Sequence, residues 1–242
     1  MKTIAKKIVA IRDKWHTKRH PFFQEFGRGK LPLRAMGLYM AQHYRFVEIV
    51  LPAFGHLLAR APDDVRRSLI ENLAEEAGLQ AIPREGHVPH DHMDDIFRFC
   101  RAAGFKDSVV RNLERTPAWW ARTLYYMTVL RDEPIGVALA MQSTQEGQQV
   151  ALNVEVTLPA FAKHYGYPKG SPEIAFFEEH AAADAEHSTR QIDLAAKYLP
   201  TPELQARACQ VAEEVCRLRW ESISDLYRSE VLKQSPILPK AA

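Results

Sequence analysis

Cysteine is scarce in this 242-residue sequence. The three present, Cys100, Cys209 and Cys216, are an odd number and include no Cys-x-x-Cys pair. Secreted domains that depend on disulfides carry more cysteines, at paired spacings. A disulfide framework is therefore not expected, and the composition favours the reducing cytoplasm.

Long apolar runs are also missing. No stretch approaches the roughly 20 apolar residues that a membrane-spanning helix requires. The N-terminal sequence MKTIAKKIVAIRDKW is interrupted by charged residues, and it has neither the apolar core nor the small-residue cleavage site of a signal peptide. We therefore expect no membrane partner.

An excess of charge of one sign is absent too. The sequence has 32 Lys and Arg against 30 Asp and Glu. Nucleic-acid binding calls for a basic field that this balance does not indicate. The chain is 46% hydrophobic and 26% charged, which is ordinary for a globular protein with a full core. A small-molecule substrate is the expected partner.

Strand patterns are not found, because no run of alternating β-branched residues lies between turn signals. Helical periodicity dominates instead, and proline and glycine divide the chain into about seven to nine helices. We therefore predict an all-α bundle forming a single domain over residues 1–242, with 235–242 as a frayed tail. The predicted helices cover about 4–15, 33–60, 62–78, 91–103, 107–115, a segment starting at 117, 134–164, 171–198 and 201–232.

The predicted helix 171–198 carries three ionisable residues on its expected core-facing stripe. His180, Asp184 and His187 stand at i, i+4 and i+7, so they share one side of the helix over two turns. Burying such groups without partners is costly, and two imidazoles with a carboxylate suit a first-row metal ion. The alternative is an exposed polar stripe, because the same helix has the charged residues Glu178, Glu179, Glu186 and Arg190.

The predicted helix 134–164 is interrupted by a polar stretch, residues 142–149, which contains no large apolar side chain. Such a stretch in the middle of a helix indicates the wall of a polar pocket, or else an exposed bulge. Glu146 is its only acid and is the predicted ligand, with Glu155 as the fallback. Gly147 lowers helix stability by about 1 kcal/mol relative to Ala but leaves room for a group to approach the backbone.

A third signal combines an acid at a helix end with a histidine-rich segment. Glu76 comes shortly before Gly78, and His87, His90 and His92 follow. Histidines in loops are usually solvated. One of them, together with Glu76, could nonetheless complete the opposite wall of a metal site.

Together these signals supply three carboxylates and three imidazoles without a thiolate. Two irons that share carboxylate bridges need such a set, and they keep open positions for O2 and substrate. Manganese remains an alternative, whereas zinc more often has three or four ligands. The ferritin-like motif Glu-x-x-His is absent, and only Asp184-x-x-His187 is comparable, so an ordinary ferritin-like fold is disfavoured.

The chain resembles the haem-oxygenase-like di-metal oxidases and oxygenases, which share their fold with thiamin-salvage enzymes and with the final enzyme of pyrroloquinoline quinone synthesis. The resemblance covers most of the chain and is carried by the segments 73–78, 92–99, 164–166 and 176–187. It implies the metal ligands Glu76, His92, Glu146, His180, Asp184 and His187. The resemblance also implies that Glu76, Glu146 and Asp184 are the catalytic carboxylates.

The resemblance selects His92 over His87 and His90, because Arg98 and Phe99 stand where the family's Arg-Phe follows its histidine. One departure is that His92 lies sixteen positions after Glu76, farther than is usual in the family.

Three specialised branches of this superfamily are not favoured. Thiamin-salvage members use a cysteine within a region where this chain, over 117–208, has none. Quinone-synthesis members generally have Arg where His180 stands. Members that form para-aminobenzoate use a Lys ten residues beyond the mid-chain Glu, a position that is Val156 here.

The resemblance implies an O2-activating non-haem di-iron enzyme that oxidises a small amine, amino acid or carboxylate by N-oxygenation or by C–H or C–C cleavage. It also implies an external reductant and allows a homodimer. The alternative is a cofactorless oxidase with His180 and His187 as acid–base groups, or a metal-free binding protein. Several aromatic and histidine side chains are candidate walls of the substrate pocket, although aromatics at helical spacing more often belong to a core. These are Tyr39, His43, Tyr44, Trp119, Trp120 and Tyr125.

Overall fold

The computed structural model describes residues 3–79 and 90–234, with the backbone alone for 182–189. The predicted tail, 235–242, lies outside the described residues. The α-helices are α1 (Thr3–Lys14), α2 (Pro21–Gly27), α3 (Leu33–Arg60), α4 (Asp63–Glu76), α5 (His92–Ala102), α6 (Asp107–Asn112), α7 (Pro117–Asp132), α8 (Ile135–Glu146), α9 (Gln149–Leu152), α10 (Leu158–Ala160), α11 (Ala175–Lys197) and α12 (Pro202–Glu230). Two 3₁₀ segments, η1 (Thr17–Arg19) and η4 (Pro172–Ile174), and two π-helical segments, η2 (Asn153–Thr157) and η3 (Phe161–Tyr165), complete the fold.

The all-α prediction is confirmed, and within the described residues the only extended pairing is one isolated bridge between Ala77 and Asp91. Most helices begin at the positions that proline and capping side chains in the sequence predicted as helix starts. The Thr116 hydroxyl, for example, accepts from the backbone N–H of Trp119 at the start of α7, and Pro117 is the first residue of that helix.

The helical segments slightly outnumber the seven to nine expected. Helix α2 was missed because its seven residues are too few to show a periodicity. It is capped by the ring of His20, whose Nδ1 accepts from the N–H of Phe22. The predicted helix 134–164 is divided at Gly147 and again at the two π segments. Pro159, which has no N–H to donate, lies between those two segments.

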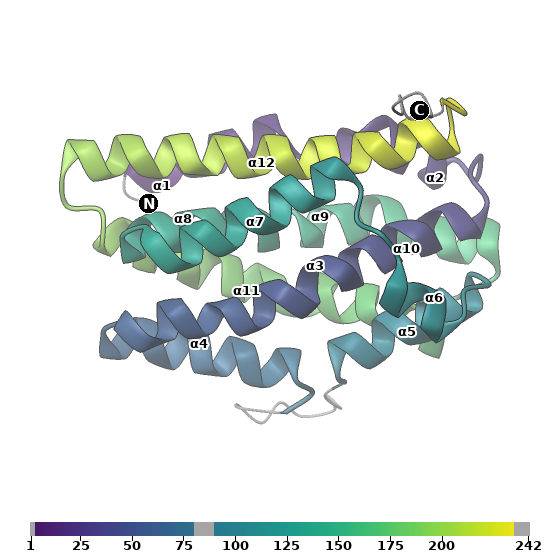
Figure 1. Ribbon diagram of the computed structural model, residues 1–242, viewed down its shortest axis with the longest axis horizontal. Helices are drawn as coiled ribbons and strands as arrows, with labels where there is room; N and C mark the ends of the chain where they lie inside the picture. The colour runs from purple at the N-terminus through teal and green to yellow at the C-terminus, as the bar shows by residue number, and fades with distance from the viewer. Residues whose placement is uncertain (1–2, 80–89, 235–242) are drawn as a thin grey trace, which may run out of the picture.

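Helix α8 is the central element of the bundle. It packs against α11 and α12, and also against α1 and α7. In Figure 1, α12 forms one long edge, α7 and α8 lie next to it, and α4 and α5 lie on the opposite side. Because neighbours cover α8 on several sides, all its residues from Gly136 to Gln145 are buried. Any polar side chain on α8 must therefore find its partner inside the protein.

Gly136 allows α8 to approach the end of α11 closely. A Cβ atom at this position would lie 2.4 Å from the carbonyl oxygen of Tyr198. Real Cβ atoms do not tolerate such a distance, and the clashing atom belongs to the backbone. The glycine therefore sets the spacing of the two helices that carry four of the six predicted ligands.

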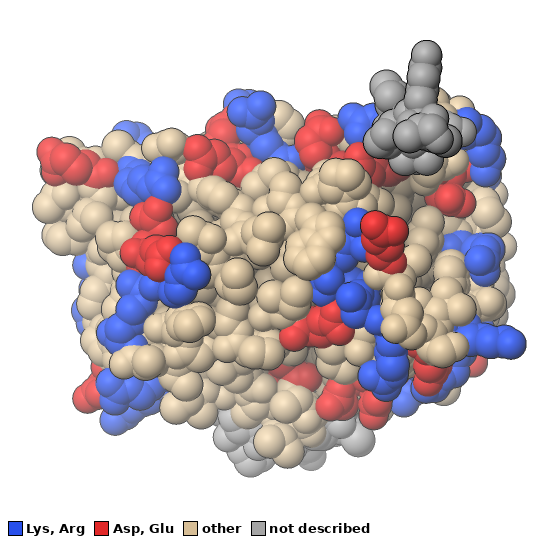
Figure 2. Space-filling model, in the orientation of Figure 1, with Lys and Arg blue, Asp and Glu red and all other residues tan. Residues whose placement is uncertain are grey.

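The surface is mixed in charge. Figure 2 shows Lys and Arg interspersed with Asp and Glu around a largely uncharged central area. Helix α7 contributes the exposed apolar side chains of Trp120 and Leu124. Among the described helices, none combines the length and the apolar character needed to cross a membrane.

Candidate metal centre

A cavity of about 90 Å³ lies inside the bundle, and four of the six predicted ligands line it: Glu76, His92, Glu146 and His180. They come from α4, α5, α8 and α11, so distant parts of the sequence meet there. The other two, Asp184 and His187, are helical positions of α11 whose side chains lie outside the described residues. Their positions fall between His180 and Gln191, whose amide reaches Glu146.

The end of α4 and the start of α5 bring Glu76 and His92 together. Glu76 is the last residue of α4, and Gly78 then takes a left-handed conformation with φ of 70°. The bridge between Ala77 and Asp91 returns the chain to this point, and the Asp91 carboxylate caps α5, whose first residue is His92. The sixteen-residue separation in sequence thus closes into a direct contact between the two side chains.

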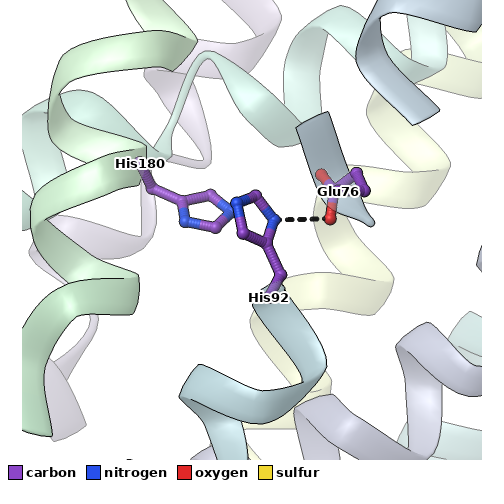
Figure 3. Close-up of side chains that lie close together, drawn as sticks. All are labelled: Glu76, His92 and His180. Atoms are coloured by element: carbon purple, nitrogen blue, oxygen red, sulfur yellow. Dashed lines mark hydrogen bonds and ion pairs between the residues drawn. The ribbon is translucent and has the colours of Figure 1, made fainter. Parts of the chain in front are cut away.

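His92 lies between two carboxylates. Its Nδ1 is 2.7 Å from Glu76 Oε2 (Figure 3). Its Nε2 is 3.4 Å from Glu179 Oε2. Burial lowers the pKa of His92, but the charge of Glu76 and its contact with Glu179 raise it well above the ordinary value. Burial alone would raise the pKa of Glu76. The charge and hydrogen bond of the adjacent His92 outweigh this effect and hold the pKa of Glu76 at about 2.

His180 presents a neutral imidazole. Its Nδ1–H donates to the carbonyl oxygen of Phe176 at 2.7 Å, and its ring centroid lies 4.5 Å from that of His92. Burial and the charge of His92 lower its pKa to about 4. A carbonyl that fixes one ring nitrogen leaves Nε2 available, which is how metal-binding histidines are usually held.

Glu146 is half-buried, and it is the last residue of α8. It accepts from Gln142 Nε2 at 2.8 Å and from Gln191 Nε2 at 2.5 Å. Burial raises its pKa to about 7, and the charge of Glu76 adds to the effect. The polar stretch of α8 is thus a buried wall and not an exposed bulge. The fallback acid, Glu155, faces solvent and pairs with Lys18 at 2.7 Å.

The donor set fits a first-row metal ion. One ligand atom each from Glu76, His92 and His180 lie within 4.8 Å of one another. A bound cation would replace the proton of His92 and would offset carboxylates that are otherwise costly to bury. Nitrogen and oxygen donors without sulfur are typical of iron, manganese or zinc.

Glu179 was not predicted as part of the site. The sequence placed it among the surface charges of its helix, yet only 9% of its side chain is exposed, and it contacts His92. Its position directly before His180 is the only signal in the sequence. A contact between α11 and α5 cannot be inferred from that position alone.

Of the predicted pocket walls, His43 lines the cavity. Tyr39, Tyr44 and Trp119 are buried in the core away from it, because aromatic residues at helical spacing pack against neighbouring helices. Trp120 is 40% exposed, and Tyr125 donates to Glu214 near the surface. Gln145 and Gln149 of the predicted polar wall also line the cavity. Sequence reasoning missed several other lining residues, including Phe46, Asn72, Arg122, Tyr126, Phe176 and Arg219.

Fold and donors together define a class, the haem-oxygenase-like helical proteins with an internal histidine–carboxylate centre. Residues 38–220 match a family described as iron-containing redox enzyme, and the chain belongs to that family. It is therefore an oxidoreductase that uses iron.

Sequence relatives agree with this assignment. A 4-aminobenzoate synthase of Nitrosomonas europaea is 22% identical and covers 94% of this chain and 92% of its own length. One of Chlamydia muridarum is 23% identical, with 76% and 74% covered.

Solved structures show the same fold. A TenA homologue from Pseudomonas syringae pv. tomato superimposes with a TM-score of 0.76 at 16% identity, covering 93% of each chain. A domain with a haem-oxygenase-like fold from Shewanella denitrificans gives 0.74 at 18% identity, with 98% of this chain and 96% of its own covered.

Because the pKa of Glu146 is raised, we expect the stability of the metal-free protein to depend on whether this residue is ionised. Glu146→Gln is expected to be more stable than the parent at pH 8 by up to about 3 kcal/mol. The pKa of Glu146 is about 7 in the folded protein against an ordinary 4.5. Ionisation of Glu146 therefore lowers the free energy of unfolding of the parent progressively between pH 4.5 and pH 7, and the loss is complete above pH 7. Denaturant unfolding of both proteins from pH 4.5 to 8 measures the difference, and a difference independent of pH would contradict this account.

Proposed function

We propose that the protein is an O2-activating, non-haem di-iron oxidase or oxygenase that acts on a small amine, amino acid or carboxylate. The observation that carries the proposal is the cavity where Glu76, His92, Glu146 and His180 meet. Asp184 and His187, on the adjoining turns of α11, are proposed to complete the ligand set. Iron would supply the reduction of O2.

The residues around the ligands are proposed to hold them in place. The carbonyl of Phe176 fixes the tautomer of His180, and the amides of Gln142 and Gln191 orient Glu146. Such supporting contacts keep a metal site rigid. Phe46 and Phe176 line the same cavity, where their apolar rings are proposed to limit the entry of water.

The electron balance requires an external reductant for oxygenation. In N-oxygenation, one atom of O2 enters the amine and the other leaves as water, with two protons and two electrons supplied from outside. In a simple oxidation, the substrate itself supplies the electrons. The relatives named 4-aminobenzoate synthase support a small molecule with amine or carboxylate groups as substrate.

Formation of 4-aminobenzoate itself is not part of the proposal. By sequence spacing from Glu146, Val156 takes the position where the resemblance implies Lys in para-aminobenzoate-forming members. It is half-buried and lies in η2, and its Cγ1 would be 3.1 Å from a Cβ atom at Gly27. It does not line the cavity. A valine has no amine with which to replace that lysine.

Iron stoichiometry tests the proposal. Protein loaded anaerobically with Fe(II) is expected to bind close to two irons per chain, because six ligands of mixed histidine and carboxylate type exceed the needs of one ion. Metal analysis and stopped-flow mixing with O2 are the measurements. Saturation at one iron, or undiminished activity after chelation, would remove the di-iron proposal.

A further inference from the structure

Two buried arginines line the same cavity as the candidate metal centre. Arg122 belongs to α7 and is 3% exposed, and Arg219 belongs to α12 and is 2% exposed. Neither was singled out by the sequence, and neither can ligate a metal, because a guanidinium group offers only donors. Their presence inside the bundle needs another explanation.

Neither arginine forms an ion pair with an acid among the described residues. Arg219 donates to the carbonyl of Gln145 at 2.7 Å and to Gln149 Oε1 at 3.1 Å. Arg122 forms one hydrogen bond among the described residues, from Nη2 to Gln145 Oε1 at 3.3 Å, and its Nε and Nη1 are buried without a hydrogen-bond partner. Burial and the charge of Arg219 lower the pKa of Arg122 to about 9.

The carboxylates of the metal centre are engaged elsewhere. Glu76 and Glu179 contact His92, and Glu146 accepts from two glutamine amides. The chain can supply a partner to a buried arginine where it needs one, since Arg115 pairs with Glu48 at 2.6 Å. A buried guanidinium without a counter-ion is costly, so the group that Arg122 lacks is expected to come from outside the chain.

We infer that Arg122 and Arg219 bind the carboxylate of the substrate and hold its other end toward the metal centre. This inference rests on the proposed function and narrows its substrate class to amino acids and other carboxylates. Planar guanidinium groups match the two oxygens of a carboxylate. Arg122 is already fixed against an aromatic face, because its Cζ lies 4.2 Å from the centre of the Phe46 ring.

The test uses metal-free protein in chelator, so that a carboxylate cannot bind iron. Sodium propanoate at about 100 mM is expected to raise the melting temperature by at least about 2 °C. Propanamide, and sodium chloride at equal ionic strength, should not. Arg122→Met is expected to melt no lower than the parent and to lose the propanoate response, because it removes an unpaired buried charge.

Arg115→Met is the matched control. It removes a buried arginine that has a partner, so it should melt lower than the parent and still respond to propanoate. The inference fails if the parent does not respond to propanoate or responds equally to propanamide. It also fails if sodium phosphate, and not propanoate, raises the melting temperature of the parent, or if Arg122→Met keeps the response to propanoate.

Iron loading of the same proteins separates this inference from the proposed function. A propanoate response without iron binding would leave the carboxylate site standing and remove the di-iron proposal. Two irons per chain and O2 consumption without any propanoate response would overturn the carboxylate site alone.

Discussion

His92→Ala is expected to lower O2 consumption by the iron-loaded protein more than about 100-fold. Loss of a group that merely supports a ligand costs about 10–100-fold in metal affinity or activity, and His92 is a proposed ligand itself. Its ring lies 2.7 Å from Glu76 and 3.4 Å from Glu179. Its removal would leave both carboxylates without their shared partner. An oxygen electrode with a chemical reductant measures the rate.

His90→Ala is the matched control. His90 is half-buried and stands two positions earlier, but it does not line the cavity. It should keep most of the O2 consumption. His87, the third histidine of this region, lies outside the described residues and can be tested in the same way. Full activity of His92→Ala, or loss of activity in either of the other two variants, would show that the wrong histidine was assigned.

Gly136→Ala is expected to destabilise the protein by about 3 kcal/mol. The added Cβ would lie 2.4 Å from the backbone oxygen of Tyr198, so α8 and α11 would have to separate. Overpacking of a core costs about 1–3 kcal/mol, and occasionally more, because side chains and backbone must shift. Here a helix must shift, and it carries Glu146 with it. Iron affinity should therefore fall together with stability.

Gly55→Ala is the control with the same chemical change. Gly55 lies exposed in α3, and nothing is within 4 Å of a Cβ at that position. Alanine favours a helix over glycine by about 1 kcal/mol. Denaturant unfolding should show the two substitutions moving the free energy of unfolding in opposite directions. Equal effects at the two positions would mean that the approach of α8 to α11 is not tight.

The helices could be predicted where local chemistry determines them. Helix α3 begins just after Pro32 and α12 just after Thr201, because proline and a threonine cap act within one turn of the chain. The stripe through His180 was visible for the same reason, since a helical period places its members on one face. These features depend only on neighbours in the sequence.

Contacts between distant helices could not be predicted in this way. Glu179 meets His92 across 87 positions (179 − 92), and Arg122 and Arg219 meet at the cavity from α7 and α12. A charged residue on a helix is usually exposed, so neither the sign nor the spacing of these three charges distinguished them from ordinary surface residues. The helical spacing of the aromatic residues fits a packed core as well as a pocket wall, and Tyr39 and Trp119 belong to the core.

The π-helical segment η2 affects how this chain should be aligned with its relatives. A π turn closes hydrogen bonds from i to i+5, so it holds one more residue than an α turn does. Such a turn resembles a single-residue insertion that the helix absorbs without forming a loop. Counting ten residues from Glu146 leads to Val156 in the sequence. It does not show which side of the helix Val156 occupies, because the π turn changes the number of residues per turn. Alignments across 153–165 need gaps placed by structure, and motifs defined there by spacing alone will compare residues that face different neighbours.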